Sequence, residues 1–124
     1  GTKVSCGVGD CGTCTVLVDD KAIKSCIYPV MKAKAKDVLT IEGISGVDGD
    51  LHPLQQAFLD HFAIQCGYCT PGMIMMAKAL LDENPDATEE EIKQGLSGNL
   101  CRCTGYVKIV EAVAAVQKSG KYYL

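Results

Sequence analysis

Apolar and polar residues follow two different periods along this chain of 124 residues, and the period changes near residue 50. In the first part, residues 15–18 (TVLV) alternate β-branched and apolar side chains, which is typical of a strand. Asp19-Asp20 predicts a tight turn, and residues 22–26 return as a second strand. A third strand is expected over residues 38–41, before a glycine-containing linker over residues 43–49.

From His52 onward, apolar side chains recur about every 3.6 residues, which predicts helices. The first helix has four apolar residues on one face, namely Leu54, Ala57, Phe58 and Phe62. Thr70 followed by Pro71 is typical of an N-cap with proline at the first helical position. This pair predicts that a second helix starts there and continues through Leu81.

Two further helices follow in the pattern. Thr88 and Glu91 form a capping box, which predicts a short third helix that ends near Gly95 or Gly98. A fourth helix is expected from about residue 104 to 117, with valine and isoleucine side chains on its apolar face.

These elements predict an α+β fold with a β-rich module over residues 1–48 and a four-helix module over residues 49–124. About 48% of the residues are apolar and 22% are charged, as in globular proteins. The net charge of −3 gives no reason to expect nucleic acid or an anionic membrane as a partner. We see neither a membrane-spanning apolar run nor a secretory signal, so we expect a cytoplasmic protein without membrane insertion.

Eight cysteines in so short a chain change the picture from a plain globular protein to one stabilised by cross-links or metal. We call the first four the front cysteines, and they are Cys6, Cys11, Cys14 and Cys26. Three of them stand as C-x4-C-x2-C on a glycine-rich loop, which is the spacing of plant-type [2Fe–2S] ferredoxins. Glycine allows such a loop to bring amide N–H groups close to the sulfur atoms, where they stabilise negative charge.

The rear cysteines form two pairs, Cys66 with Cys69 and Cys101 with Cys103. Each pair precedes a predicted helix, and a helix N-terminus favours anionic sulfur and lowers thiol pKa values. Two such helix starts side by side would gather four thiolates. Structural zinc is an alternative for this set alone, although C-x-C is an unusual zinc spacing. A disulfide framework is a second alternative, and it would require an oxidising compartment.

Three motifs in order resemble those of the small iron–sulfur subunit of the molybdenum hydroxylases. They are GxxxSCGVGDCGTCTV with Cys26 after it, QCGYCTPG at residues 65–72, and GNLCRCTGY at residues 98–106. The family includes xanthine dehydrogenases, aldehyde oxidoreductases and carbon monoxide dehydrogenases. Its members usually carry two strands and a helix before the first motif, so we expect Gly1 to lie inside a longer protein.

The resemblance implies two [2Fe–2S] clusters. The front cysteines would hold one in a β-grasp, ferredoxin-like domain, and the rear cysteines would hold the other in a helical domain. It further implies a large partner subunit that carries molybdopterin, and a medium subunit that carries FAD. By the same resemblance, Gln65 and Cys103 lie nearest the pterin, and electrons pass from the molybdenum site through the rear and then the front cluster.

The chain is therefore expected to relay electrons and to have no catalytic residues of its own. One alternative is a free-standing two-cluster ferredoxin, and another is a zinc-stabilised interaction module. His52 and His61 are expected to be surface or helix-packing residues, because eight thiolates already satisfy two clusters. The methionines at positions 73, 75 and 76 are expected to fill the core.

Overall fold

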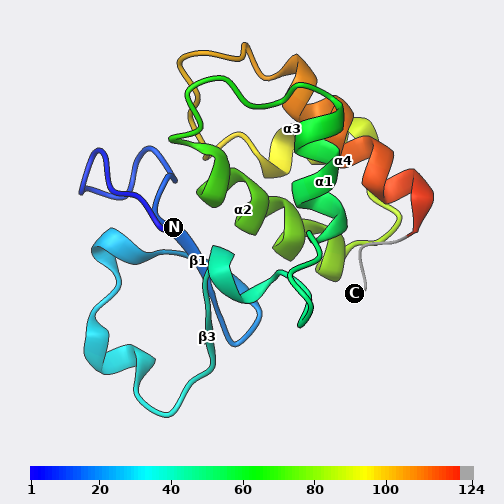
Figure 1. Ribbon diagram of the computed structural model, residues 1–124. Coiled ribbons are helices and arrows are strands. Elements are labelled where there is room, and N and C mark those ends of the chain that lie inside the picture. Colours follow the sequence, from blue (N-terminus) through cyan, green and yellow to red (C-terminus); the bar gives the residue numbers. More distant parts are fainter. Residues whose placement is uncertain (121–124) are drawn as a thin grey trace.

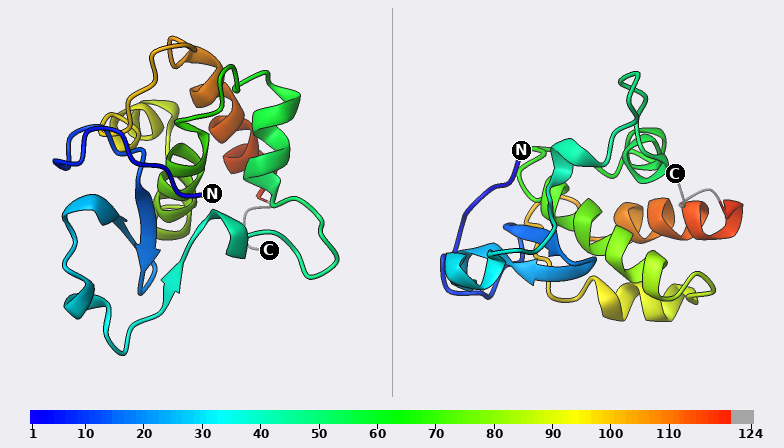
Figure 2. Two further views of the ribbon diagram at one scale, coloured as in Figure 1. Left: turned by 60° about the vertical axis from the view of Figure 1, so that its left-hand side comes forward. Right: turned by 90° about the horizontal axis from the view of Figure 1, so that it is seen from below.

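The computed structural model describes residues 1–120, and it places a small antiparallel sheet on one side of four helices (Figure 1). The sheet contains β1 (Thr15–Val18), β2 (Lys21–Lys24) and β3 (Val38–Leu39), in the order β2-β1-β3. The α+β fold predicted from the sequence is therefore confirmed. Figure 2 shows the strands and the helices as two layers that lie side by side.

The β1–β2 hairpin follows the prediction closely. Asp19 and Asp20 both have positive φ angles, 48° and 65°, and connect Val18 to its partner Lys21. Two residues with positive φ make a turn whose twist matches that of the strands. The second strand ends at Lys24, earlier than predicted, because the chain then enters a 3₁₀ turn over Ser25–Ile27.

The third strand is also shorter than the prediction. It pairs only Val38 and Leu39 with β1, and another 3₁₀ turn, Ile41–Gly43, follows it. The backbone N–H of Asp19 donates to the carbonyl oxygen of Asp37 at 2.9 Å, which ties the hairpin turn to the start of β3.

The four helices are α1 (Pro53–Asp60), α2 (Thr70–Glu83), α3 (Glu89–Gly95) and α4 (Val107–Ser119). The predicted capping box of α3 is present: Thr88 Oγ1 accepts from the N–H of Glu91, and the Glu91 carboxylate accepts from the N–H of Thr88.

Three predicted helix positions need correction. Phe62 lies beyond the end of α1, at a φ of 55°, and its side chain is exposed rather than on the apolar face. Cys69, not Thr70, occupies the N-cap position of α2. The start of α4 lies at Val107 rather than near Thr104, because Gly105 and Tyr106 adopt left-handed backbone angles that no helix contains.

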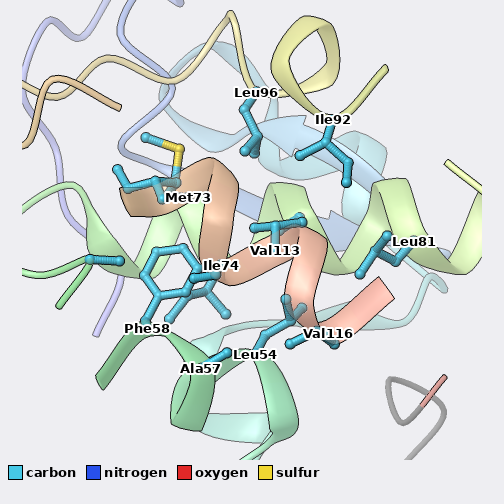
Figure 3. Packing of buried hydrophobic residues seen from close by; sticks show 14 of the residues in the cluster. Leu54, Ala57, Phe58, Met73, Ile74, Leu81, Ile92, Leu96, Val113 and Val116 are labelled. Carbon is cyan, nitrogen blue, oxygen red and sulfur yellow. The ribbon is translucent and has the colours of Figure 1, made fainter. Parts of the chain in front are cut away.

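The core lies between the helices, as Figure 3 shows. Leu54 and Phe58 of α1 meet residues of α2 and α4, and the sheet contributes Leu17 of β1, against which α2 packs. Met73 and Met75 are fully buried, and Met76 packs against the same cluster, so the prediction of core methionines is confirmed. Within residues 1–120 no helix is long and apolar enough to cross a bilayer.

Candidate functional site

Seven of the eight cysteines lie in three segments that meet at one end of the molecule, and Cys26 lies in the 3₁₀ turn Ser25–Ile27 after β2. In Figures 1 and 2 the N-terminal loop (blue), the connection before α2 (green) and the connection before α4 (orange) gather there. The N–H of Leu100 donates to the carbonyl oxygen of Cys11 at 2.8 Å. The hydroxyl of Thr13 donates to the carbonyl oxygen of Tyr68 at 3.2 Å. Hydrogen bonds thus join the front loop directly to both rear segments.

The front loop wraps around the sulfur of Cys6. Cys6 Sγ accepts backbone N–H groups from Val8, Asp10 and Cys11 at 3.3–3.4 Å. Gly7 and Gly9 have φ angles of 68° and 81°, and these left-handed conformations turn the amides toward the sulfur. The N–H donors, that of Val8 first, lower the pKa of Cys6 to about 6. The loop is therefore built to stabilise an anionic sulfur.

The four front cysteines form two pairs. The thiol of Cys11 hydrogen-bonds Cys6, and the thiol of Cys26 hydrogen-bonds Cys14. Cys14 is buried, and its sulfur also accepts the N–H of Cys26 at 3.4 Å. Burial, the Cys14 hydrogen bond and the neighbouring sulfurs, Cys6 among them, raise the pKa of Cys26. The structure thus brings all four front cysteines together.

The rear cysteines line one open cavity of about 420 Å³. Cys66 pairs with Cys103 and Cys69 pairs with Cys101 through thiol hydrogen bonds, and charge interactions link the two pairs. Cys11 of the front set also lines this cavity. In the described part of the chain, no three His, Cys, Asp or Glu side chains converge on a single metal position. The thiols are instead arranged two by two.

The expected effect of helix N-termini on the rear thiols is only partly present. Cys69 occupies the N-cap position of α2 without a capping hydrogen bond from its side chain, and burial raises its pKa to about 12, with a further increase from the hydrogen bond to Cys101. Cys103 is four residues from the start of α4, too far for the helix dipole to act strongly. Burial opposes ionisation of Cys101, but hydrogen bonds from Thr104, the Cys103 N–H and the Cys69 thiol together outweigh it and lower the Cys101 pKa.

The two halves meet at a close junction that no sequence pattern predicts. Asn99 is 3% exposed, and its side-chain amide donates to the carbonyl oxygen of Gly12 at 2.9 Å and to Thr15 Oγ1 at 3.4 Å. A Cβ atom added at Gly72 would lie 2.6 Å from the carbonyl oxygen of Gly12 and 2.7 Å from that of Thr13. The sequence signal for this junction is the polar residue Asn99 inside the GNLCRCTGY motif.

Gln65 and the two histidines are the remaining residues that the sequence singled out. Gln65 is exposed and directly precedes Cys66, and both Cys66 and Cys103 are exposed at the rim of the rear cavity. His52 is buried as the N-cap of α1, where Nδ1 accepts the N–H of Leu54 at 3.1 Å. His61 follows α1 at its C-cap. Neither histidine lines the rear cavity.

Two family models match the chain. Residues 1–40 match a "2Fe-2S iron-sulfur cluster binding domain", and residues 40–114 match a "[2Fe-2S] binding domain". Together they span both cysteine sets.

Named relatives and solved structures agree with these models. The nicotinate dehydrogenase small FeS subunit of Eubacterium barkeri is 52% identical over 111 residues, which are 90% of this chain and 70% of that protein. The crystal structure of quinoline 2-oxidoreductase from Pseudomonas putida 86 superposes with a TM-score of 0.88 at 41% identity, covering 98% of this chain and 77% of that one. Aldehyde oxidoreductase from Desulfovibrio desulfuricans gives 0.87 at 47% identity, covering 97% of this chain and 14% of the other.

Proposed function

Because the chain belongs to the family of small [2Fe–2S] iron–sulfur subunits of the molybdenum hydroxylases, we propose that it relays electrons within such an oxidoreductase. The relay connects a molybdopterin site on a large partner subunit with FAD, on a medium subunit, or with another acceptor. The chain itself supplies no catalytic residue. Its eight cysteines hold two [2Fe–2S] clusters, one for each set.

The observation that carries this proposal is the grouping of the eight thiols. Each set contains four thiols, as one [2Fe–2S] cluster requires, and within each set the thiols pair two by two. A [2Fe–2S] cluster takes four thiolates, so each set would supply a complete set of ligands. Thiolate is the soft ligand that iron–sulfur clusters select.

The residues around the sulfurs also fit an anionic cofactor. When bound, a [2Fe–2S] cluster supplies reversible one-electron transfer. Backbone N–H groups already face Cys6 in the front set, and Thr104 faces Cys101 in the rear set. Such donors stabilise negative charge on sulfur and adjust the reduction potential. The chain therefore places hydrogen-bond donors beside sulfurs that would hold each cluster.

We assign the front cluster to a ferredoxin-like β-grasp domain over residues 1–48, and the rear cluster to a four-helix domain over residues 49–124. The sheet elements and the four helices support this division. Gln65 and Cys103 form the edge that faces the pterin in this proposal. Their exposure beside the rear cavity leaves them available to a partner subunit.

The experiment uses the full chain, purified anaerobically with whatever proteins accompany it. Two clusters require about four irons and equivalent acid-labile sulfide per chain, with two distinguishable EPR signals on reduction. A stable complex with a large molybdenum-containing subunit is expected. Zinc in place of iron would contradict the cluster assignment, and a fully loaded chain that never associates with such a subunit would identify a free-standing ferredoxin instead.

A further inference from the structure

The connection between the last cysteine and α4 holds a short chain of hydrogen bonds that ends on sulfur. The hydroxyl of Thr104 donates to Cys101 Sγ at 3.1 Å, and the backbone N–H of Thr104 donates to the same sulfur at 3.4 Å. The backbone N–H of Tyr106 in turn donates to Thr104 Oγ1 at 3.3 Å. A hydroxyl has one proton, so accepting from Tyr106 leaves that proton directed at Cys101.

The backbone fixes this arrangement. Gly105 and Tyr106 adopt successive left-handed conformations, with φ angles of 67° and 73°, which fold the chain back toward Cys101. The phenolic oxygen of Tyr106 accepts the N–H of Cys101 at 2.9 Å and closes the fold. For a non-glycine residue such a φ is costly, so the contacts at both ends of Tyr106 must hold it. The Thr104 hydroxyl therefore cannot easily turn away from the sulfur.

We propose that Thr104 is a positioning residue that acts through Cys101 and raises the reduction potential of the rear cluster. The inference rests on the proposed function, because it requires a cluster on the rear cysteines. Reduction adds negative charge, and a hydrogen bond to an anionic sulfur is stronger than one to a less charged sulfur. Donation from Thr104 to Cys101 therefore favours the reduced form over the oxidised form.

Thr70 provides a matched control for this proposal. Both threonines directly follow the second cysteine of a rear pair, Thr70 after Cys69 and Thr104 after Cys103. The backbone N–H of Thr70 donates to the carbonyl oxygen of Gly67 at 3.3 Å. Within residues 1–120, the Thr70 hydroxyl donates to none of the thiols, in contrast to the hydroxyl of Thr104.

The test is an EPR-monitored redox titration of the assembled, cluster-loaded protein, with the front cluster as internal reference. Thr104→Val keeps the shape of the side chain and removes the hydroxyl, while Thr104→Ser keeps the hydroxyl. We expect Thr104→Val to lower the equilibrium constant for reduction of the rear cluster on the order of tenfold, which is about 59 mV for one electron. Thr104→Ser should keep the rear potential close to that of the unmodified protein, and Thr70→Val should leave it unchanged.

The results that would overturn the role of the Thr104 hydroxyl differ from those that would refute the relay function. An unchanged rear potential in Thr104→Val, or an equal shift in Thr70→Val, would overturn the role of the hydroxyl while leaving the relay function intact. Failure of Thr104→Val and Thr104→Ala alike to load the rear cluster would overturn it too, since the hydroxyl would then serve assembly. Absence of any rear cluster in the unmodified protein would instead refute the proposed function itself.

Discussion

The side-chain amide of Asn99 donates a hydrogen bond to the carbonyl oxygen of Gly12 at 2.9 Å, although 87 residues separate them in sequence. This bond connects the segment before Cys101 to the loop between Cys11 and Cys14. Backbone bonding between Leu100 and Cys11 lies beside it. The positions of the two cysteine sets relative to each other are therefore fixed by buried polar contacts, and not by apolar packing alone.

Replacing Asn99 with alanine should destabilise the protein by about 0.5–1.5 kcal/mol, because its buried hydrogen bond to the Gly12 carbonyl oxygen is lost while that oxygen keeps the N–H and hydroxyl donors of Thr15. Chemical denaturation of the loaded protein measures this change. Gln94→Ala, an exposed position on α3, is the control and should change the unfolding free energy little. Equal stability of the Asn99→Ala and Gln94→Ala proteins would show that the buried amide contributes nothing.

Replacing Gly72 with alanine should separate α2 from the front loop. Its new methyl group would press on the backbone of Gly12 and Thr13, which cannot rotate away as a side chain can. Overpacking of this kind costs about 1–3 kcal/mol, which thermal unfolding detects. Gly98→Ala is the matched control, since its nearest neighbour is the flexible amine of Lys24 at 3.7 Å. A Gly72→Ala protein as stable as the control would mean that the contact relaxes freely.

Replacing Cys103 with serine should disturb the rear cluster and spare the front one. Cys103 hydrogen-bonds Cys66 and interacts electrostatically with Cys66 and Cys101, all of which belong to the rear set. EPR spectra of the reduced protein should therefore lose or broaden one signal and retain the other. Equal damage to both signals would contradict the division into two sets of four.

Replacing Gln65 with alanine should leave both clusters in place and weaken the proposed contact with a pterin on a partner subunit. Gln65 is exposed, so its loss should not affect folding of this chain. The measurement compares molybdenum and pterin content and turnover of the complex with those of Gln94→Ala. If content and turnover both equal those of the control, Gln65 has no such role.

The α3 capping box should make stability depend on acid pH. The N–H and then the hydroxyl of Thr88 hydrogen-bond the Glu91 carboxylate and lower its pKa. A lowered carboxyl pKa adds stability that is fully present above the usual glutamate value of about 4.3 and is lost as pH falls through the lowered value.

The melting temperatures of the unmodified protein and Glu91→Gln, compared over a pH series, measure this effect. The advantage of the unmodified protein should be largest near neutral pH and shrink in acid. Glu90→Gln removes a charge from the same turn without touching Thr88, and so controls for net charge. An advantage that stays constant down to acid pH would argue against the capping interaction.

Local signals predicted much of this fold. The Thr88–Glu91 capping box and the Asp19-Asp20 turn are confirmed because both depend on residues only a few positions apart. The spacing within each cysteine motif is local in the same way, whereas the meeting of Cys66 and Cys69 with Cys101 and Cys103 depends on a contact across the chain. The class of fold followed from the change of hydrophobic period near residue 50.

Other features depend on contacts across the chain, which no local pattern contains. Thr104-Gly105-Tyr106 resembles a helix start, but the hydroxyl of Tyr106 accepts the Cys101 N–H, and the left-handed turn delays α4 to Val107. The raised pKa of Cys69 arises from burial, which outweighs the helix N-terminus expected from sequence. The junction at Asn99 joins this residue to Gly12, and neither the hydrophobic period nor the cysteine spacing predicts that the two meet.

The glycine at position 72 has a consequence for chimeric proteins built from members of this family. At that point α2 approaches the peptide groups of Gly12 and Thr13 closely enough to exclude a methyl group. A front half from one protein and a rear half from another should therefore fit together only when the close backbone contact at Gly72 is kept. A rear half exchanged into this chain should therefore carry glycine at the position of Gly72.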